Sequence, residues 1–170
     1  KRGYVTLAPD TLCFEERQHP ALRGTDYERF EATRRLTEGS CLQAKMLWDL
    51  QRALDYLLTR REVDRRRIGC LGHSLGGQET LFLSALDRRI VVGVSNCGFS
   101  SYRAIFDAAI LHNFAAYVPG LLRYGDLDRV LGLVAPRPFL VLAGSGDPLF
   151  PLEGVQASGR SARRAYGKAK

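Results

Sequence analysis

Residues 72–76 read Gly-His-Ser-Leu-Gly, the G-x-S-x-G pattern of a nucleophilic serine on a sharp turn. Five residues with three defined positions are a weak signal alone, but their surroundings strengthen it. The apolar run 68–72 before them is typical of a strand, and the stretch 76–86 is apolar nearly all round, as in a buried helix. The sequence therefore predicts a nucleophile elbow here rather than an ordinary glycine-rich turn.

The chemistry explains the spacing of this pattern. A serine raised above the sheet on a strained turn leaves no room for side chains two residues away, so we expect glycine to be required at Gly72 and at Gly76. The helix that follows points its partial positive charge at the reacting group. We predict that Ser74 is the nucleophile and that the backbone N–H of Leu75 donates a hydrogen bond to the oxyanion.

A serine nucleophile needs a base, and the base needs an acid to orient it. Asp147 comes soon after the apolar run 138–143, at the edge where parallel α/β sheets carry their functional groups. We predict that Asp147 is the acid, the alternative being an aspartate that only caps the next helix. Asp126 and Asp128 are competing carboxylates, but no predicted strand ends at either of them.

No histidine occupies the place that the base should have. In enzymes with such an elbow the chain order is serine, acid, histidine, so the base should follow Asp147. The histidines are His19, His73 and His112, and residues 148–170 contain none. His73 adjoins the nucleophile and should point elsewhere, and we expect His112 to be a packing or pocket residue rather than the base. These 170 residues therefore lack a complete triad.

The cysteines and the first residues carry no further site. The four cysteines, at positions 13, 41, 70 and 97, form no C-x-x-C pair, so neither a zinc site nor a thioredoxin-type site is indicated. We expect no metal and no organic cofactor. A reducing compartment, the cytoplasm by default, is the expectation for unpaired cysteines, and the first residues show no apolar signal-peptide core.

The distribution of charge along the chain is a candidate signal of binding. The formal net charge is +7, with one basic group near the end of the chain and another in residues 60–67. The terminal group comprises Arg160, Arg163, Arg164, Lys168 and Lys170. Such groups could contact phosphates, but a solvated helix end and an exposed arginine-rich turn explain them. We expect no nucleic-acid partner, and no membrane partner because no apolar run approaches about 18 residues.

Length and composition describe one globular domain, with 45% hydrophobic and 25% charged residues in 170. Short apolar runs alternate with stretches of helical periodicity, which indicates a parallel sheet in an α/β fold. The predicted strands are residues 4–8, 68–72, 90–95 and 138–143. The predicted helices are residues 40–59, 76–86 and a last one opened by Pro151. Residues 10–39 are predicted to be irregular, and residues 97–134 irregular with short helical pieces.

The start of the first helix has its own signal. Ser40 followed by Gln43 has the spacing of a capping box, in which each side chain bonds the other residue's backbone N–H. The apolar residues that follow recur at helical spacing and predict one buried face.

The sequence resembles the α/β-hydrolases along essentially its whole length. The matching segments are Gly3 to Asp10, residues 65–77, Ala135 to Pro138 and Gly146 to Pro151. The closest branch is that of the dienelactone hydrolases with the related acetyl-xylan-esterase-like and prolyl-oligopeptidase-like enzymes. The resemblance gives Ser74, Asp147 and Leu75 the same roles as above.

The resemblance implies a serine hydrolase that acts on carboxylic esters through a Ser-His-Asp triad, with a small-molecule or carbohydrate-linked ester as its substrate. A prolyl-oligopeptidase-type peptidase shares these residues and is one alternative. A non-catalytic binding protein of the same fold is another, although the retained glycines on both sides of the serine argue against it. The oligomeric state is left open.

The resemblance also implies an incomplete domain. Members of this family carry further strands and an oxyanion loop before the first matching segment, and a last strand, the catalytic histidine and a helix after the final one. We therefore expect residues 1–170 to be a partial catalytic domain, cut at both ends and inactive alone, with a naturally truncated pseudoenzyme as the alternative. In the family order a further strand separates 4–8 from 68–72, so 4–8 should either stay unpaired or pair with 68–72. The strands at 68–72, 90–95 and 138–143 should pair in parallel in that order.

Overall fold

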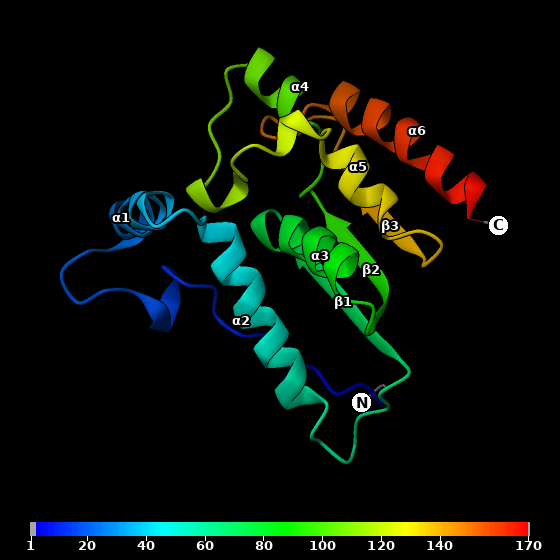
Figure 1. Cartoon of the computed structure of the whole chain (residues 1–170), viewed down its shortest axis with the longest axis horizontal. Coiled ribbons are helices and arrows are strands. Elements are labelled where there is room, and N and C mark those ends of the chain that lie inside the picture. Colours follow the sequence, from blue (N-terminus) through cyan, green and yellow to red (C-terminus); the bar gives the residue numbers. More distant parts are fainter. Residues whose placement is uncertain (1–2, 170) are drawn as a thin grey trace. The chain divides into compact units, whose positions relative to one another are not determined.

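The computed structural model describes residues 3–169, so Lys170 of the basic chain end lies outside the described residues (Figure 1). The chain divides into two compact units. One comprises residues 1–66 with 113–118, and the other residues 67–112 with 119–170. The predicted nucleophile and the predicted acid both belong to the second unit, which contains the sheet.

The sheet has three parallel strands in the order β1, β2, β3. They span Ile68–His73, Ile90–Asn96 and Phe139–Leu142. Their order and direction confirm the prediction. In the register, the last residue of β1 lies beside the last residue of β2, which lies beside the last residue of β3. The three carboxyl ends therefore meet at one level of the sheet edge.

The predicted strand at residues 4–8 is wrong. These residues take no strand conformation, and the sheet contains only the three strands just named within the described chain. Tyr4 is 84% exposed, and Val5 and Leu7 are exposed as well. A strand is stabilised by hydrogen bonds to a neighbouring strand and by a buried face, and an apolar pattern without either stays extended but unpaired. Of the two outcomes foreseen for this segment, it is the unpaired one that occurs.

One helix packs on a face of the sheet. Helix α3, Leu75–Leu86, packs against β1 and β2, and its residues 77–84 are all buried, which confirms the predicted buried helix (Figure 1). The other helices of this unit are α4 (Tyr102–Asp107), η3 (Leu121–Arg123), α5 (Leu127–Gly132) and α6 (Leu152–Lys168). Helix α6 begins after Pro151, as predicted, and packs against α4 and α5.

The opposite face of the sheet presents apolar side chains to solvent. Leu71 on β1 is 73% exposed, and Leu140 and Leu142 on β3 are exposed too. Since the register aligns Leu71 with Val94 and Val94 with Leu140, these side chains form a row across the three strands. Apolar parallel strands of this kind are suited to burial on both faces.

The first unit contains a helix that the sequence did not predict. Helix α1 spans Gly24–Thr37, within the stretch predicted to be irregular. The residues it buries are Glu28, Glu31 and Ala32, so its inner face is mostly charged. An apolar stripe, the usual sequence signal of a surface helix, is therefore missing from α1, so no hydrophobic periodicity indicates this helix.

The buried glutamates of α1 are compensated by specific partners. Glu28 accepts a hydrogen bond from the backbone N–H of Ala115, at 3.1 Å, in the short helix η2 (Phe114–Ala116). Glu31 pairs with Arg34 at 2.9 Å and with Arg35 at 3.0 Å. Burial alone would raise the pKa of Glu31, but the hydrogen bonds and charges of the two arginines lower it overall. Buried charges need this kind of pairing to be tolerated.

Helix α2, Leu42–Leu57, occupies most of the predicted range 40–59, but its predicted capping box is wrong. The N-cap residue is Cys41, and no side chain caps the helix there. Leu42 and Gln43 are both about 1% exposed, so the first turn is drawn into the core. Gln43 is therefore held inside the unit and does not reach back to the helix start. The remaining element, η1, spans Glu15–Arg17.

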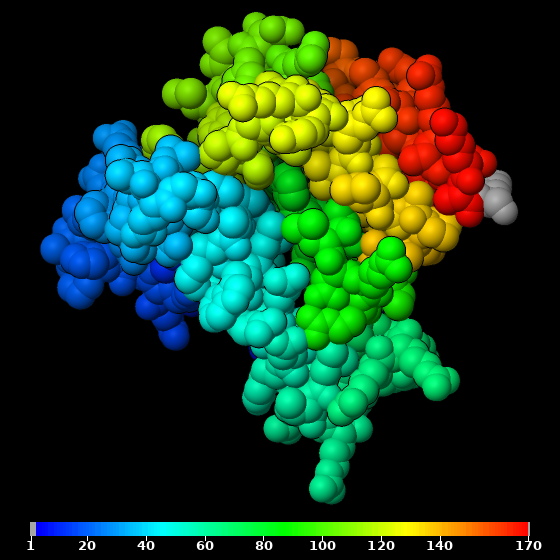
Figure 2. All heavy atoms as spheres, viewed as in Figure 1, coloured from blue at the N-terminus to red at the C-terminus, as the bar shows by residue number. Residues whose placement is uncertain are grey.

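The arginine-rich stretch 60–67 between α2 and β1 is an exposed turn, as expected. In the space-filling view it is the turquoise-green segment that projects at the lower end (Figure 2). Arg60 pairs there with Glu62 at 3.0 Å, both about half exposed. Exposed pairs of this kind contribute little to stability.

Candidate active site

Ser74 lies on a strained turn between β1 and α3. Its φ of 53° and ψ of −119° fall in a region that residues other than glycine rarely adopt. Its N–H donates to the carbonyl of Asn96 at 2.9 Å, and its own carbonyl accepts from the N–H groups of Gly77, at 2.9 Å, and Gln78, at 3.1 Å. These hydrogen bonds join the turn to the end of β2 and to the first turn of α3, and they hold the strained conformation in place.

The structure supports the steric argument for one of the two predicted glycines. A Cβ on Gly72 would overlap the backbone carbonyl group of Gly76, so only glycine fits at position 72. A Cβ on Gly76 would meet no atom within 4 Å outside its own helix backbone, so the expected clash there is wrong. The asymmetry arises because the carbonyl of Gly76 points toward Gly72 while its Cβ position faces open space.

Two further glycines hold the elbow against β2. A Cβ on Gly98 would overlap the carbonyl oxygen of Ser74, and one on Gly77 would lie 2.9 Å from the Ser95 hydroxyl and 3.1 Å from the Asn96 carbonyl. The G-x-S-x-G pattern covers neither Gly77 nor Gly98, so it does not indicate these two close approaches. The available signal for Gly98 was a glycine just beyond the end of the neighbouring strand.

The N-terminus of α3 lies at Ser74, the predicted nucleophile. Leu75 is its first residue, and the first N–H groups of a helix have no partners within the helix. Ser74 and Leu75 are both half-buried, so a reacting group could reach them from solvent. The partial positive charge at this helix end favours negative charge beside Ser74.

Asp147 lies in the loop between β3 and α6, five residues beyond the end of β3 at Leu142. Since all three strands are parallel and their last residues are in register, the turn of Ser74 and this loop leave the same edge of the sheet. Strands β1 and β3 are separated by β2, so their axes are two strand spacings, about 10 Å, apart.

The Asp147 carboxylate is part of a tight loop. Its Oδ1 accepts hydrogen bonds from the backbone N–H of Leu149 at 2.9 Å and of Phe150 at 3.2 Å. Both residues precede α6, which begins at Leu152, so Asp147 does not cap that helix. The side chain is half-buried. Both bonds use the same carboxylate oxygen.

The two competing carboxylates tie helices together. Asp126 accepts three backbone hydrogen bonds, from Leu127 at 2.7 Å, from Tyr102 at 2.8 Å and from Arg103 at 3.2 Å. It thereby caps α5 and the start of α4 with one side chain. Asp128 accepts from the hydroxyl of Ser161, which joins α5 to α6. Each of these carboxylates has a structural role.

The structure places His112 against the loop of Asp147. Its Nε2 lies 2.9 Å from the carbonyl oxygen of Leu149, and its ring lies 4.6 Å from the ring of Phe150 at an angle of 40°. Burial lowers the pKa of His112, although the bond to Leu149 and the charge of Asp147 act in the opposite direction. The packing role expected of His112 is confirmed. Nothing in the sequence spacing indicated its proximity to Asp147.

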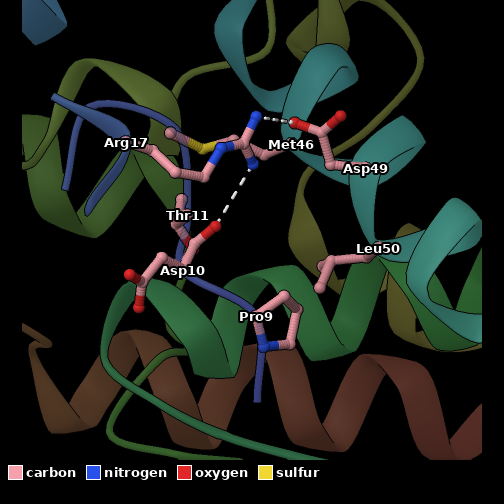
Figure 3. Close-up of a pocket in the computed structure, with 7 residues that line it drawn as sticks. All are labelled: Pro9, Asp10, Thr11, Arg17, Met46, Asp49 and Leu50. Carbon is pink, nitrogen blue, oxygen red and sulfur yellow. Dashed lines mark hydrogen bonds and ion pairs between the residues drawn. The ribbon is translucent and has the colours of Figure 1, made fainter. Parts of the chain in front are cut away.

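The first unit contains a small pocket whose lining differs in residue types from the surroundings of Ser74. Seven residues line it: Pro9, Asp10, Thr11, Arg17, Met46, Asp49 and Leu50 (Figure 3). The guanidinium of Arg17 donates to the Asp49 carboxylate at 2.8 Å and to the Asp10 carbonyl at 3.2 Å. The charges of Arg17 and Asp49 are therefore paired with each other. The lining holds neither a histidine nor a serine.

Residues 3–169 contain neither a group of metal ligands nor a membrane-spanning helix. Nowhere in this range do three or more histidine, cysteine, aspartate or glutamate side chains gather in a way that could hold a metal ion. The helices of the same range all fall short of the length and apolar character needed to cross a membrane.

Comparison with known proteins identifies the family. The dienelactone hydrolase family matches residues 1–123. YtaP, a candidate hydrolase of Bacillus subtilis (strain 168), is 36% identical over 155 residues, which are 90% of this chain and 50% of that protein. Carbohydrate esterase MZ0003, from an unknown prokaryotic organism, is 26% identical over 120 residues, 61% of this chain and 28% of its own length. The chain thus spans half or less of the length of these relatives.

Solved structures show the same fold. A glucuronoyl esterase from Solibacter usitatus superposes with a TM-score of 0.63 and 26% identity, over 76% of this chain and 37% of that one. A candidate acetyl xylan esterase from Bacteroides fragilis superposes with a TM-score of 0.75 over 94% of this chain and 43% of that one, at 18% identity. The strained serine turn, the parallel sheet and these matches agree, and the chain belongs to the dienelactone hydrolase family, with an α/β-hydrolase fold.

Proposed function

We propose that the protein is a serine hydrolase of carboxylic esters and that Ser74 is its nucleophile. The strained conformation of Ser74 at the N-terminus of α3 is the observation that carries this proposal. A strained residue persists only where the surrounding structure holds it, and such residues are found mostly at functional sites. Here Gly72 and Gly98 both lack the space for a side chain, which supports a turn built around the serine.

In the proposed reaction the Ser74 hydroxyl attacks the ester carbonyl and loses its proton to a base. The oxyanion that forms is stabilised by the N–H of Leu75 and by the partial charge of the helix end. The leaving alcohol takes the proton from the base, and water then hydrolyses the acyl-enzyme by the same steps in reverse order. No metal or organic cofactor is needed for this chemistry.

We propose Asp147 as the acid that orients the base. In support, Asp126 and Asp128 are both occupied in joining helices, whereas Asp147 lies at the sheet edge from which Ser74 also emerges. A lateral separation of about 10 Å between the two strands leaves room for an imidazole that bonds to both groups.

The base in this proposal is a histidine outside residues 1–170. His112 is bonded to Leu149, His73 is exposed on β1, and His19 accepts from the Ala21 N–H and packs against Tyr27. The proposal therefore concerns the intact protein that carries these residues, and residues 1–170 alone should be inactive.

Carbohydrate-linked or small-molecule esters are the proposed substrates. Support comes from the similar proteins named as glucuronoyl esterase and carbohydrate esterase. Acetyl esters and methyl esters of a glucuronic acid are accordingly the first substrates to compare.

The test is covalent labelling of the intact protein with a fluorophosphonate, together with hydrolysis of a simple aryl acetate. Ser74→Ala should abolish both labelling and hydrolysis, with a loss of about 10⁴-fold or more in kcat. Ser145→Ala is the matched control, because Ser145 is an exposed serine at the same edge of the sheet but in no strained turn. Labelling of another serine, or full activity in Ser74→Ala, would refute the proposal.

A further inference from the structure

The loop that carries Asp147 is held from outside by two side chains. Nε2 of His112 lies 2.9 Å from the carbonyl oxygen of Leu149, and the hydroxyl of Ser100 donates to the carbonyl of Pro151 at 3.1 Å. Ser100 is fully buried. Both residues come from the segment between β2 and η2, far from the loop in sequence, so the contacts are tertiary.

One residue, Leu149, links His112 to Asp147. The N–H of Leu149 donates to the Asp147 carboxylate at 2.9 Å, while the carbonyl of the same residue meets His112. A backbone carbonyl can only accept a hydrogen bond, so Nε2 of His112 must carry the proton. Leu149 is thus bonded on both sides, and its position links the imidazole to the carboxylate.

The ring of His112 is itself held in place. It packs on Phe150, which is 5% exposed and whose N–H also donates to Asp147 at 3.2 Å. Since burial lowers the pKa of His112, the ring is neutral at neutral pH. A neutral ring that donates from Nε2 holds the loop without adding a positive charge beside Asp147.

We propose that His112 is a positioning residue that sets the orientation of the Asp147 carboxylate through Leu149. The inference rests on the proposed function, in which Asp147 orients the catalytic base. A carboxylate that is displaced misaligns the base and slows the proton transfer, while substrate binding is little affected. Displacements of about 1 Å can reduce rates by about 10²-fold.

Two substitutions in the intact protein separate the hydrogen bond from the packing. His112→Phe keeps a ring against Phe150 and removes the donor, and it should lower kcat about 10- to 100-fold with KM changed less than about twofold. His112→Gln supplies an amide N–H at a similar reach, and it should restore kcat to within about threefold of the wild type. His19→Phe is the matched control, because His19 also meets a backbone group and an aromatic ring, but in the other unit.

A double-mutant cycle tests whether His112 acts through the acid. If it does, His112→Phe should have almost no further effect on kcat in a protein that already carries Asp147→Asn. A purely structural contribution would instead slow both backgrounds by the same factor and would overturn the proposal. Equal kcat values for His112→Phe and the wild type would overturn it too.

A variant that does not fold and a wild type that is not labelled have different consequences for the proposal. If His112→Phe does not fold, the comparison of His112→Gln with His112→Asn replaces it, because the shorter amide cannot reach Leu149 and should be the slower variant. Absence of fluorophosphonate labelling of Ser74 in the wild type would refute the proposed function itself. Labelling with unchanged kcat in all His112 variants would refute only the role of His112.

Discussion

The turn of Ser74 and the loop of Asp147 leave the same edge of one sheet but are held in different ways. The turn of Ser74 is held by backbone groups. Its hydrogen bonds join peptide N–H and carbonyl groups. At Gly72 and Gly98 the neighbouring backbone lies so close that any side chain would overlap it. The loop of Asp147 has one backbone bond, from the Asp147 N–H to the Gly144 carbonyl at 3.4 Å, and is otherwise held by side chains. These are the Asp147 carboxylate, the Ser100 hydroxyl and the His112 ring.

This difference bears on how each half of the site can vary. A turn held by backbone contacts has few tolerated substitutions, and each failure costs stability as well as activity. A loop held by side-chain hydrogen bonds can be loosened one bond at a time, so changes there should appear in the rate before they appear in the fold. Substitutions in the two regions should therefore differ in whether they change the rate, the stability or both.

Asp147→Asn should lower kcat of the intact protein by about 10³- to 10⁴-fold, since an amide can no longer stabilise the protonated base. The amide oxygen can still accept from Leu149 and Phe150, so the melting temperature should change little. Steady-state kinetics and a thermal melt of the same sample check both points. A kcat within tenfold of the wild type would show that another carboxylate has the role of the acid.

Gly72→Ala should destabilise the fold by about 3 kcal/mol or more, because its Cβ would overlap the Gly76 carbonyl group. Gly76→Ala is the matched substitution, and it should be neutral or stabilise by up to about 1 kcal/mol, since its Cβ meets open space and alanine favours helix. Urea unfolding of the two variants measures the difference. Equal stabilities would contradict the backbone account of the serine turn.

Asp126→Ala should cost about 2 kcal/mol of stability, because it leaves three backbone N–H groups at the starts of α4 and α5 without their acceptor. The kcat of the folded protein should be unchanged, in contrast to Asp147→Asn. Asp107→Ala, which removes an exposed aspartate at the end of α4, serves as the control and should alter neither quantity. A large loss of kcat in Asp126→Ala would contradict its structural role.

Protonation of the His112 ring should have the smallest effect of those considered, and it should appear as a pH dependence of stability. Its pKa in the folded protein lies below the ordinary value of about 6.5, mainly through burial, so the unfolded chain binds this proton at higher pH than the folded one. The stability associated with the neutral ring is complete above about pH 6.5 and is lost as the pH falls toward the lowered pKa. Melting temperatures between pH 8 and pH 5 should therefore fall further for the wild type than for His112→Gln, and parallel curves would contradict this.

The fold was predictable where the signal is local. Apolar runs identified β1, β2 and β3, and the nearly all-apolar stretch after Ser74 identified the buried helix α3. Helix α1 was not predicted, because its buried face carries Glu28 and Glu31 instead of an apolar stripe. The partners of these glutamates are arginines and a backbone N–H, which hydrophobic periodicity does not reveal. The segment 4–8 has a strand-like pattern and is no strand, since a strand exists only with a neighbour.

The strained turn at Ser74 could be read from the sequence alone. The constraint that requires glycine at position 72 acts between residues four apart, and steric exclusion over so short a distance is visible in the spacing G-x-S-x-G. The contacts of each carboxylate, and those that hold the loop of Asp147, became visible only in the folded chain. Asp126 meets Tyr102, and His112 meets Leu149, through hydrogen bonds between residues that are distant in the chain. Such bonds depend on how helices and loops pack, because a hydrogen bond needs its two groups within about 3 Å, and no spacing along the sequence sets that distance.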